Sequence, residues 1–221
     1  MLNNRLAVGT VQFGLNYGVV NQEGQVSVDS GRKILDYARI SGLDTLDTAV
    51  KYGNSEERLG NIQVDGWKII SKLPGIPKDC SDVTDWVYKT VKNSLARIGV
   101  PKLYGLLLHY PNQLFDETGD QLYLALSQLV TEGLVDKIGI SIYSPDELTI
   151  VLNKFQFDLV QAPFNPIDHR LITSGWLKYF EENNVELHVR SIFLQGLLVT
   201  HPSELPRKFL RWKIFLERWY Q

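Results

Sequence analysis

The sequence predicts an α/β fold with a parallel sheet, and within that class a (β/α)8 barrel of the TIM type. Apolar, strand-sized runs alternate with amphipathic helical segments in units of roughly 30 residues, as in successive βαβ units. Several of these runs are apolar almost throughout, as in strands covered on both faces. At least five of them end on polar residues, at the position where barrel folds carry their functional groups.

Seven strands and the helices between them are predicted from this alternation. The strands cover residues 5–10, 43–48, 67–72, 103–109, 135–141, 158–164 and 185–192. Helical periodicity begins near Asp29, Ser55, Ser81, Gln121, Ser144 and Ser174. Residues 202–221 are predicted to form one more amphipathic helix, with an apolar stripe made of Leu205, Phe209, Trp212, Leu216 and Trp219.

A doubly wound open sheet is the competing fold. Such a sheet usually carries a glycine-rich phosphate turn after its first strand, and the segment GTVQFGLNYG does not have the GxGxxG spacing. The polar strand ends favour the barrel. We expect a single barrel domain over residues 1–221, incomplete at its C-terminal end because no eighth βα unit is recognisable. Unpaired edges on the first and seventh strands would favour self-association.

Composition and charge exclude several classes of protein. The formal net charge of -2 argues against a general nucleic-acid or anionic-membrane binder. No apolar run approaches the roughly 18–20 residues of a membrane span. The single cysteine, Cys80, rules out a disulfide framework, and the histidines have no metal-ligand spacing, so we propose no metal site. No secretory signal is visible at the N-terminus, and we expect a cytoplasmic protein.

Four polar side chains stand at or just beyond predicted strand ends. Asp47 ends the second strand and Tyr52 follows it, whereas Lys72 and His109 end the third and fourth. Neighbouring strand ends in a barrel lie about 5 Å apart, so all four can converge on one pocket.

Elementary acid–base chemistry gives each of the four a role. A phenol titrates near pH 10, and a nearby ammonium stabilises the tyrosinate, so we expect Lys72 to lower the pKa of Tyr52. Asp47 would keep Lys72 charged and oriented. His109 would hydrogen-bond a carbonyl oxygen, to which Tyr52 gives its proton as general acid. Taken singly, each residue also has an ordinary structural reading, such as a turn cap, a solvated strand end or a core histidine.

Several segments together resemble the aldo-keto reductase superfamily. They are GTVQFG, LDTLDTAVKYGNSEERLG, the strand ending at Lys72, LLLH, GIS and RSIFLQGLL, and the resemblance spans about residues 6–198. It implies a barrel fold and reduction of an aldehyde or ketone, or the reverse oxidation, with NADPH. The family's catalytic Asp, Tyr, Lys and His fall on the four residues named above. The opening and the RSIFLQGLL segment are similar to bacterial members linked to surface polysaccharides, which points to a sugar-related carbonyl substrate.

The same resemblance assigns the cofactor contacts. The nicotinamide carboxamide partners fall on Ser141 and Gln161, at the ends of the fifth and sixth strands. Residues that match the pyrophosphate segment follow the seventh strand: Ser191, Phe193, Gln195 and Gly196.

Three departures from the family pattern modify these expectations. Ile142 stands where an Asn amide usually contacts the cofactor, and Arg190 stands where many members stack an aromatic ring on the nicotinamide. A guanidinium also stacks on π faces, so we expect an altered contact at Arg190. The segment that grips the adenosine 2′-phosphate is not recognisable, which implies weak NADPH binding. A catalytically impaired fragment, or a non-catalytic binding or assembly protein on the same scaffold, is the alternative.

Overall fold

A computed structural model describes residues 5–220 of the chain. Residues 1–4, which belong to the segment searched for a secretory signal, lie outside the described residues, as does Gln221 at the end of the predicted last helix. No helix within the described part of the chain is long and apolar enough to cross a lipid bilayer.

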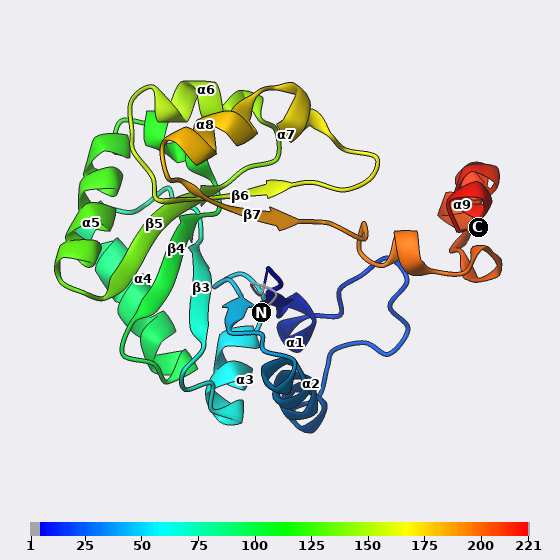
Figure 1. The fold of residues 1–221 in the computed structure, drawn as a ribbon. Helices are drawn as coiled ribbons and strands as arrows, with labels where there is room; N and C mark the ends of the chain where they lie inside the picture. Colours follow the sequence, from blue (N-terminus) through cyan, green and yellow to red (C-terminus); the bar gives the residue numbers. More distant parts are fainter. Residues whose placement is uncertain (1–4, 221) are drawn as a thin grey trace.

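Seven parallel strands form one curved sheet in which they follow one another in chain order, and this confirms the predicted barrel-type topology. The sheet curves into an open half-barrel (Figure 1), and no pairing between β1 and β7 closes it within residues 5–220. The strands are β1 (Val8–Gly9), β2 (Thr45–Asp47), β3 (Lys68–Leu73), β4 (Leu103–Leu108), β5 (Val135–Ser141), β6 (Leu159–Pro163) and β7 (Glu186–Arg190).

Helices cover the outer face of this sheet (Figure 1). Between the strands lie α1 (Val11–Gly14), α2 (Val28–Ile40), α3 (Ser55–Ile62), α4 (Val83–Ile98), α5 (Gly119–Thr131), α6 (Asp146–Leu152), α7 (Arg170–Thr173) and α8 (Trp176–Glu182). A short 3-10 turn, η1 (Pro111–Phe115), follows β4. The main core fills the layer between helices and sheet, because the apolar faces of both are buried there.

The longest helix, α4, shows why these segments are helical. The Asp82 carboxylate accepts a hydrogen bond from the Asp85 N–H at its start, and Gly99 ends it with a left-handed φ of 78°. Its apolar side chains recur every three or four residues and are buried against the sheet: Val83, Val87, Val91, Leu95 and Ile98. The capping residues and the buried apolar face of α4 therefore both favour a helix over the same residues.

The two ends of the chain differ from the prediction. The first strand is only Val8–Gly9, because Thr10, the N-cap residue of α1, leaves the extended conformation with ψ near 14°. The single C-terminal helix expected over residues 202–221 is wrong. Pro206 lies between two short 3-10 turns, η3 (Pro202–Glu204) and η4 (Arg207–Trp212), and only α9 (Lys213–Tyr220) is α-helical.

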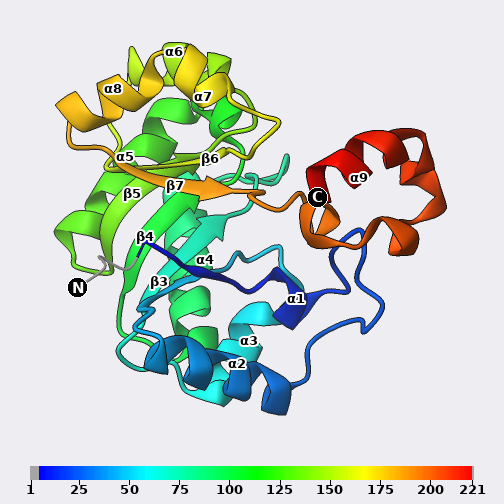
Figure 2. The same cartoon turned by 45° about the vertical axis from the view of Figure 1, so that its right-hand side comes forward.

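The predicted apolar stripe of that segment is consequently divided. Leu205 and Leu216 pack with Leu198 in a small separate cluster, whereas Trp212 and Trp219 are about half exposed. Figures 1 and 2 both show this C-terminal arm projecting away from the sheet, beyond the loop that follows β7. The arm therefore adds little to the barrel core.

Candidate active site

Asp47 and Tyr52 are held by a buried hydroxyl cluster under the turn that follows β2. The Ser55 Oγ donates to the Thr10 carbonyl at 2.9 Å, and the Thr48 hydroxyl donates to Ser55 Oγ at 3.1 Å. The Thr10 hydroxyl bonds the Asp47 carbonyl at 3.0 Å. Each of these hydroxyl groups is buried and satisfied, so the turn that carries the carboxylate and the phenol has one preferred conformation.

Close backbone packing fixes the same turn from its other side. A Cβ at Gly14 would lie 1.5 Å from the Tyr52 carbonyl oxygen, and one at Gly53 would lie 2.3 Å from the Gly14 carbonyl. Gly53 also has a left-handed φ of 58°, which favours glycine. The helix α1 therefore sets the position of the Tyr52 backbone.

Lys72 and Asp47 form an ion pair at the base of the site. The Lys72 Nζ lies 2.7 Å and 2.8 Å from the two Asp47 carboxylate oxygens and donates to the Thr48 carbonyl at 2.9 Å. The Lys72 side chain is 1% exposed and that of Asp47 19%. Burial lowers the pKa of Lys72 because it disfavours the ammonium, and the Asp47 charge opposes that effect.

Tyr52 lies directly over this pair, but its pKa does not move as the sequence suggested. The Lys72 Nζ is 4.9 Å from the centroid of the Tyr52 ring. Burial of the phenol and the Asp47 carboxylate nevertheless raise the pKa of Tyr52 well above its usual value. The expectation that Lys72 lowers this pKa is wrong for this geometry, because Asp47 neutralises the ammonium at close range and desolvation dominates.

His109 faces Tyr52 across the site as a neutral imidazole. The two rings meet edge to face with centroids 6.1 Å apart. Burial and the nearby Lys72 and Lys51 charges lower the pKa of His109 to about 4. Its Nδ1 is buried without a hydrogen-bond partner among the described residues. A buried ring nitrogen left unpaired is costly, so this atom is a marker of function.

The four residues thus come together as the sequence predicted, on one cavity of about 640 Å³ at the carboxyl ends of the strands. Asp47, Tyr52 and His109 line this cavity and Lys72 lies beneath them. A model of the aldo/keto reductase family matches residues 5–211.

The chain belongs to the aldo/keto reductase family.

Individual relatives agree with this family assignment. The chain is similar to oxidoreductase sirO of Leptosphaeria maculans, at 27% identity over 200 residues, which are 86% of this chain and 59% of sirO. It is also similar to YqkF of Bacillus subtilis, described as an uncharacterized oxidoreductase, at 28% identity over 77% of this chain and 58% of YqkF. The chain therefore spans about three-fifths of the length of these curated relatives.

Solved structures of the family share the fold. The aldo-keto reductase AKR11C1 of Bacillus halodurans, in its holo form, superposes with a TM-score of 0.72 at 21% identity, over 92% of this chain and 66% of that one. The glycerol dehydrogenase AKR11B4 of Gluconobacter oxydans gives a TM-score of 0.71 at 24% identity, over 98% and 71% of the two chains. The open half-barrel matches part of a family (β/α)8 barrel.

The residues that the family pattern assigns to the carboxamide lie opposite Asp47. Ser141 and Gln161 are paired in register on β5 and β6, and the Ser141 hydroxyl donates to Gln161 Oε1 at 3.3 Å. The Gln161 Nε2 donates to Asp47 Oδ1 at 2.7 Å, across the interior of the sheet. Nothing in the sequence indicated this cross-barrel bond, since it joins residues 114 positions apart.

The loop after β7 forms the remaining wall of the cavity. Arg190, Ser191, Phe193, Gln195 and Gly196 all line it. Within this loop Ser191, Leu194, Gln195 and Gly196 have positive φ. The Leu194 and Gly196 N–H groups donate to the Ser191 and Phe193 carbonyls at 3.1 Å and 3.0 Å, so the loop is built of tight turns.

Sequence reasoning missed several cavity residues, some of which lie on the loop after α1. Nothing in the sequence marked this loop as a wall of the site. Gly196 packs on it, since a Cβ there would lie 2.5 Å from Val20 Cγ2. The missed residues include Gln12, Tyr17, Val20, Asn21, Tyr143 and His188.

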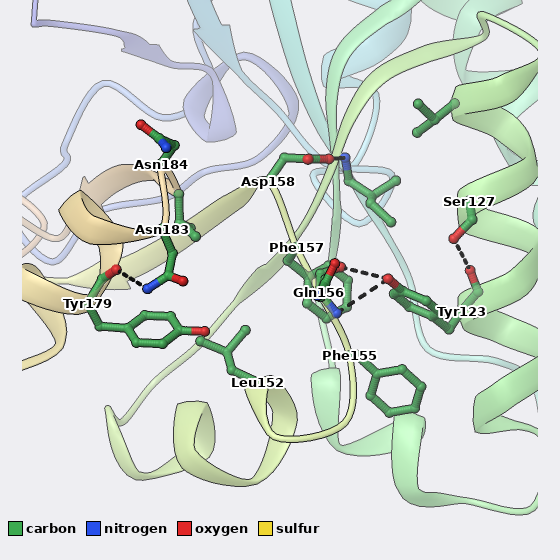
Figure 3. Close-up of a pocket in the computed structure, with 13 residues that line it drawn as sticks. Tyr123, Ser127, Leu152, Phe155, Gln156, Phe157, Asp158, Tyr179, Asn183 and Asn184 are labelled. Carbon is green, nitrogen blue, oxygen red and sulfur yellow. Dashed lines mark hydrogen bonds between the residues drawn. The ribbon is translucent and has the colours of Figure 1, made fainter.

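A second cavity of about 430 Å³ lies at the opposite end of the sheet (Figure 3). Its lining includes Tyr123 on α5, which contacts Phe155 and Phe157 on the segment between α6 and β6, with ring centroids 4.9 Å and 5.7 Å apart. Its one carboxylate, Asp158, accepts the Ile138 N–H at 3.0 Å at the start of β6 and is therefore structural. No group of three His, Cys, Asp or Glu side chains placed to hold a metal occurs among residues 5–220.

We predict strong coupling between Asp47 and Lys72. Lys72→Met leaves the carboxylate without its counter-charge, and Asp47→Asn leaves a buried ammonium, so each variant should lose stability. The double variant should lose less than the sum of the two, with a coupling free energy of about 1–3 kcal/mol. Urea unfolding of the four proteins measures it, and additive losses would contradict the ion pair.

We also predict that His109 contributes to acid sensitivity. Its folded-state pKa of about 4 lies below the ordinary 6.5, so the unfolded chain binds the proton more readily. The contribution of this imidazole to stability is therefore complete above about pH 6.5 and is lost as the pH falls toward about 4. His109→Asn should show a shallower loss of unfolding free energy between about pH 7 and pH 5 than wild type. Parallel curves for the two proteins would refute this.

Proposed function

We propose that this chain carries the active site of an NADPH-dependent reductase of aldehydes or ketones, with Tyr52 as the general acid. One observation supports this most strongly: a half-buried phenol, a neutral imidazole and the carboxylate of a compensated Lys72–Asp47 pair line one cavity. Oxidoreductases of the same family are its relatives. The opposite direction, oxidation of an alcohol, uses the same groups with Tyr52 as base.

Tyr52 and His109 would bind and polarise the substrate oxygen. The raised pKa of Tyr52 keeps the phenol protonated at neutral pH, so it donates a hydrogen bond to a carbonyl oxygen. As that oxygen becomes an alkoxide, it becomes a stronger base than a phenolate and takes the proton. The neutral imidazole of His109 supplies a second hydrogen bond that directs the oxygen without adding a charge.

The residues around the cavity fit a nicotinamide cofactor. An aldo-keto reductase of Bombyx mori, with a TM-score of 0.63 at 18% identity, is solved in complex with NADP. Here Ser141 and Gln161 line the cavity with a hydroxyl and a carboxamide, and the loop after Arg190 lines it with the residues that match the family's pyrophosphate segment. When bound, the reduced nicotinamide supplies the hydride. A small carbonyl compound, of the sugar-related class that the motifs suggest, would occupy the space beside Tyr52.

The test replaces the phenol. Tyr52→Phe should lower the rate of carbonyl reduction about 10²- to 10⁴-fold, because the proton donor is lost, while NADPH affinity stays unchanged. NADPH oxidation with a panel of aldehydes and sugar-derived ketones measures the rate, and fluorescence titration measures the affinity.

Tyr110→Phe is the matched control. Tyr110 is another phenol near the site, 40% exposed and in contact with His109, but it does not line the cavity. Its removal should leave the rate unchanged. Full activity in Tyr52→Phe would defeat the assignment of the general acid.

A second candidate is a non-catalytic protein that uses the scaffold for binding or assembly. The open sheet favours it, because within residues 5–220 β1 and β7 each pair with a strand on one side only. Under this reading we expect concentration-dependent self-association in sedimentation velocity. Neither this chain nor a version extended through an eighth βα unit would then reduce any carbonyl of the panel. Turnover by the extended version alone would instead identify this chain as part of an enzyme.

A further inference from the structure

Arg190, at the end of β7, presents a fixed guanidinium to the cavity. Its Nη2 donates to the Ile142 carbonyl at 2.8 Å and its Nη1 to the Ser191 hydroxyl at 3.4 Å. The guanidinium carbon also lies 4.4 Å from the centroid of the Tyr143 ring. Two hydrogen bonds and a stacked ring hold the group in place, so its charge is pre-positioned on the cavity wall.

No carboxylate compensates this charge within the described part of the chain. Both hydrogen-bond acceptors of Arg190 are neutral oxygens. The Asp47 carboxylate is paired with Lys72, and Glu186, further down β7, is paired with Lys137. His109 is neutral at pH 7, since its pKa is about 4. Arg190 is therefore the uncompensated charge among these groups.

The field of Arg190 reaches the reacting end of the cavity. Its charge lowers the pKa values of Tyr52, Lys72 and His109, although other effects outweigh it at Tyr52. A nicotinamide ring that passes hydride to a carbonyl carbon beside Tyr52 must lie within about 3–3.5 Å of that carbon. Such a ring would occupy the cavity that Tyr52 and Arg190 both line.

We propose that Arg190 makes this site discriminate between the two oxidation states of the nicotinamide cofactor, in favour of the reduced one. The inference rests on the proposed function and extends it to the cofactor's charge. The oxidised nicotinamide ring carries one positive charge that the reduced ring lacks, and a fixed cation repels it. The oxidised cofactor then leaves more readily after carbonyl reduction, so the site favours reduction over alcohol oxidation.

The test measures two dissociation constants without any turnover. NADPH binding is followed by fluorescence titration, and NADP+ binding by displacement of NADPH, in wild type, Arg190→Gln and Arg190→Lys. We expect the ratio of the NADP+ constant to the NADPH constant to fall about tenfold in Arg190→Gln, as for loss of one close charge in a partly solvated site. Arg190→Lys keeps the charge and should keep most of the ratio.

Lys51→Gln is the matched control. Lys51 also carries a charge that reaches His109, but it is exposed and hydrogen-bonds the Tyr110 hydroxyl at 3.0 Å. Solvent screens such a charge, so its removal should leave the ratio within about twofold of wild type. An equal fall in Lys51→Gln and Arg190→Gln would assign the effect to net charge and overturn the proposal.

The remaining outcomes distinguish a failure of the Arg190 proposal from a failure of the proposed reductase function. If both cofactor forms bind and Arg190→Gln leaves their ratio unchanged, the role of Arg190 is refuted and the reductase assignment stands. If wild type binds neither form at millimolar concentration, the proposed function of this chain fails and the inference fails with it. A circular dichroism spectrum equal to that of wild type shows that each variant is folded.

Discussion

The buried contact between Lys72 and Asp47 is the interaction on which the site depends. An ammonium that is 1% exposed is tolerable only with a counter-charge and a full set of acceptors. It obtains these from Asp47 and from the Thr48 carbonyl, which are consecutive residues at the end of β2. Holding the ammonium therefore also fixes the start of the turn that carries Tyr52.

The same carboxylate ties distant parts of the open sheet together. Gln161 on β6 donates to Asp47 on β2 across the concave interior of the sheet. It does so although, within residues 5–220, the sheet is not closed between β1 and β7. Three elements thus share one anion: β2 carries it, β3 neutralises it and β6 hydrogen-bonds it. A network of this kind stabilises one arrangement of the strand ends, because each partner left unpaired would carry a desolvation penalty.

The sequence was sufficient for the order of elements and for the residues at the strand ends. Both follow from local patterns: alternating apolar runs give the seven strands, and the last residue of a strand lies at the same edge as its neighbours. Burial depth does not follow from such patterns. The sequence places Lys72 near Tyr52, but the direction of the Tyr52 pKa depends on how much water reaches the phenol and on where the Asp47 charge lies.

Long-range and irregular features escaped the sequence for a related reason. The Gln161–Asp47 bond and the Arg190–Tyr143 stack join residues whose separation in the chain carries no periodic signal. The C-terminal arm was mispredicted although its apolar residues do recur with helical periodicity. Pro206 separates the two 3-10 turns η3 and η4, so the segment does not form one helix. Only packing decides which of its apolar side chains are buried.

The two walls of the cavity differ in how firmly the fold supports them. Asp47, Lys72 and His109 sit at the ends of three consecutive paired strands with the main core behind them. The loop after β7 leads from the last strand of the sheet into an arm that has only a small cluster of its own. Local stability increases with the number of buried contacts. The wall formed by the ends of β2, β3 and β4 is therefore the more stable one. Arg190 secures the other wall, because its bond to Ile142 and its stack on Tyr143 join the end of β7 to the segment that follows β5.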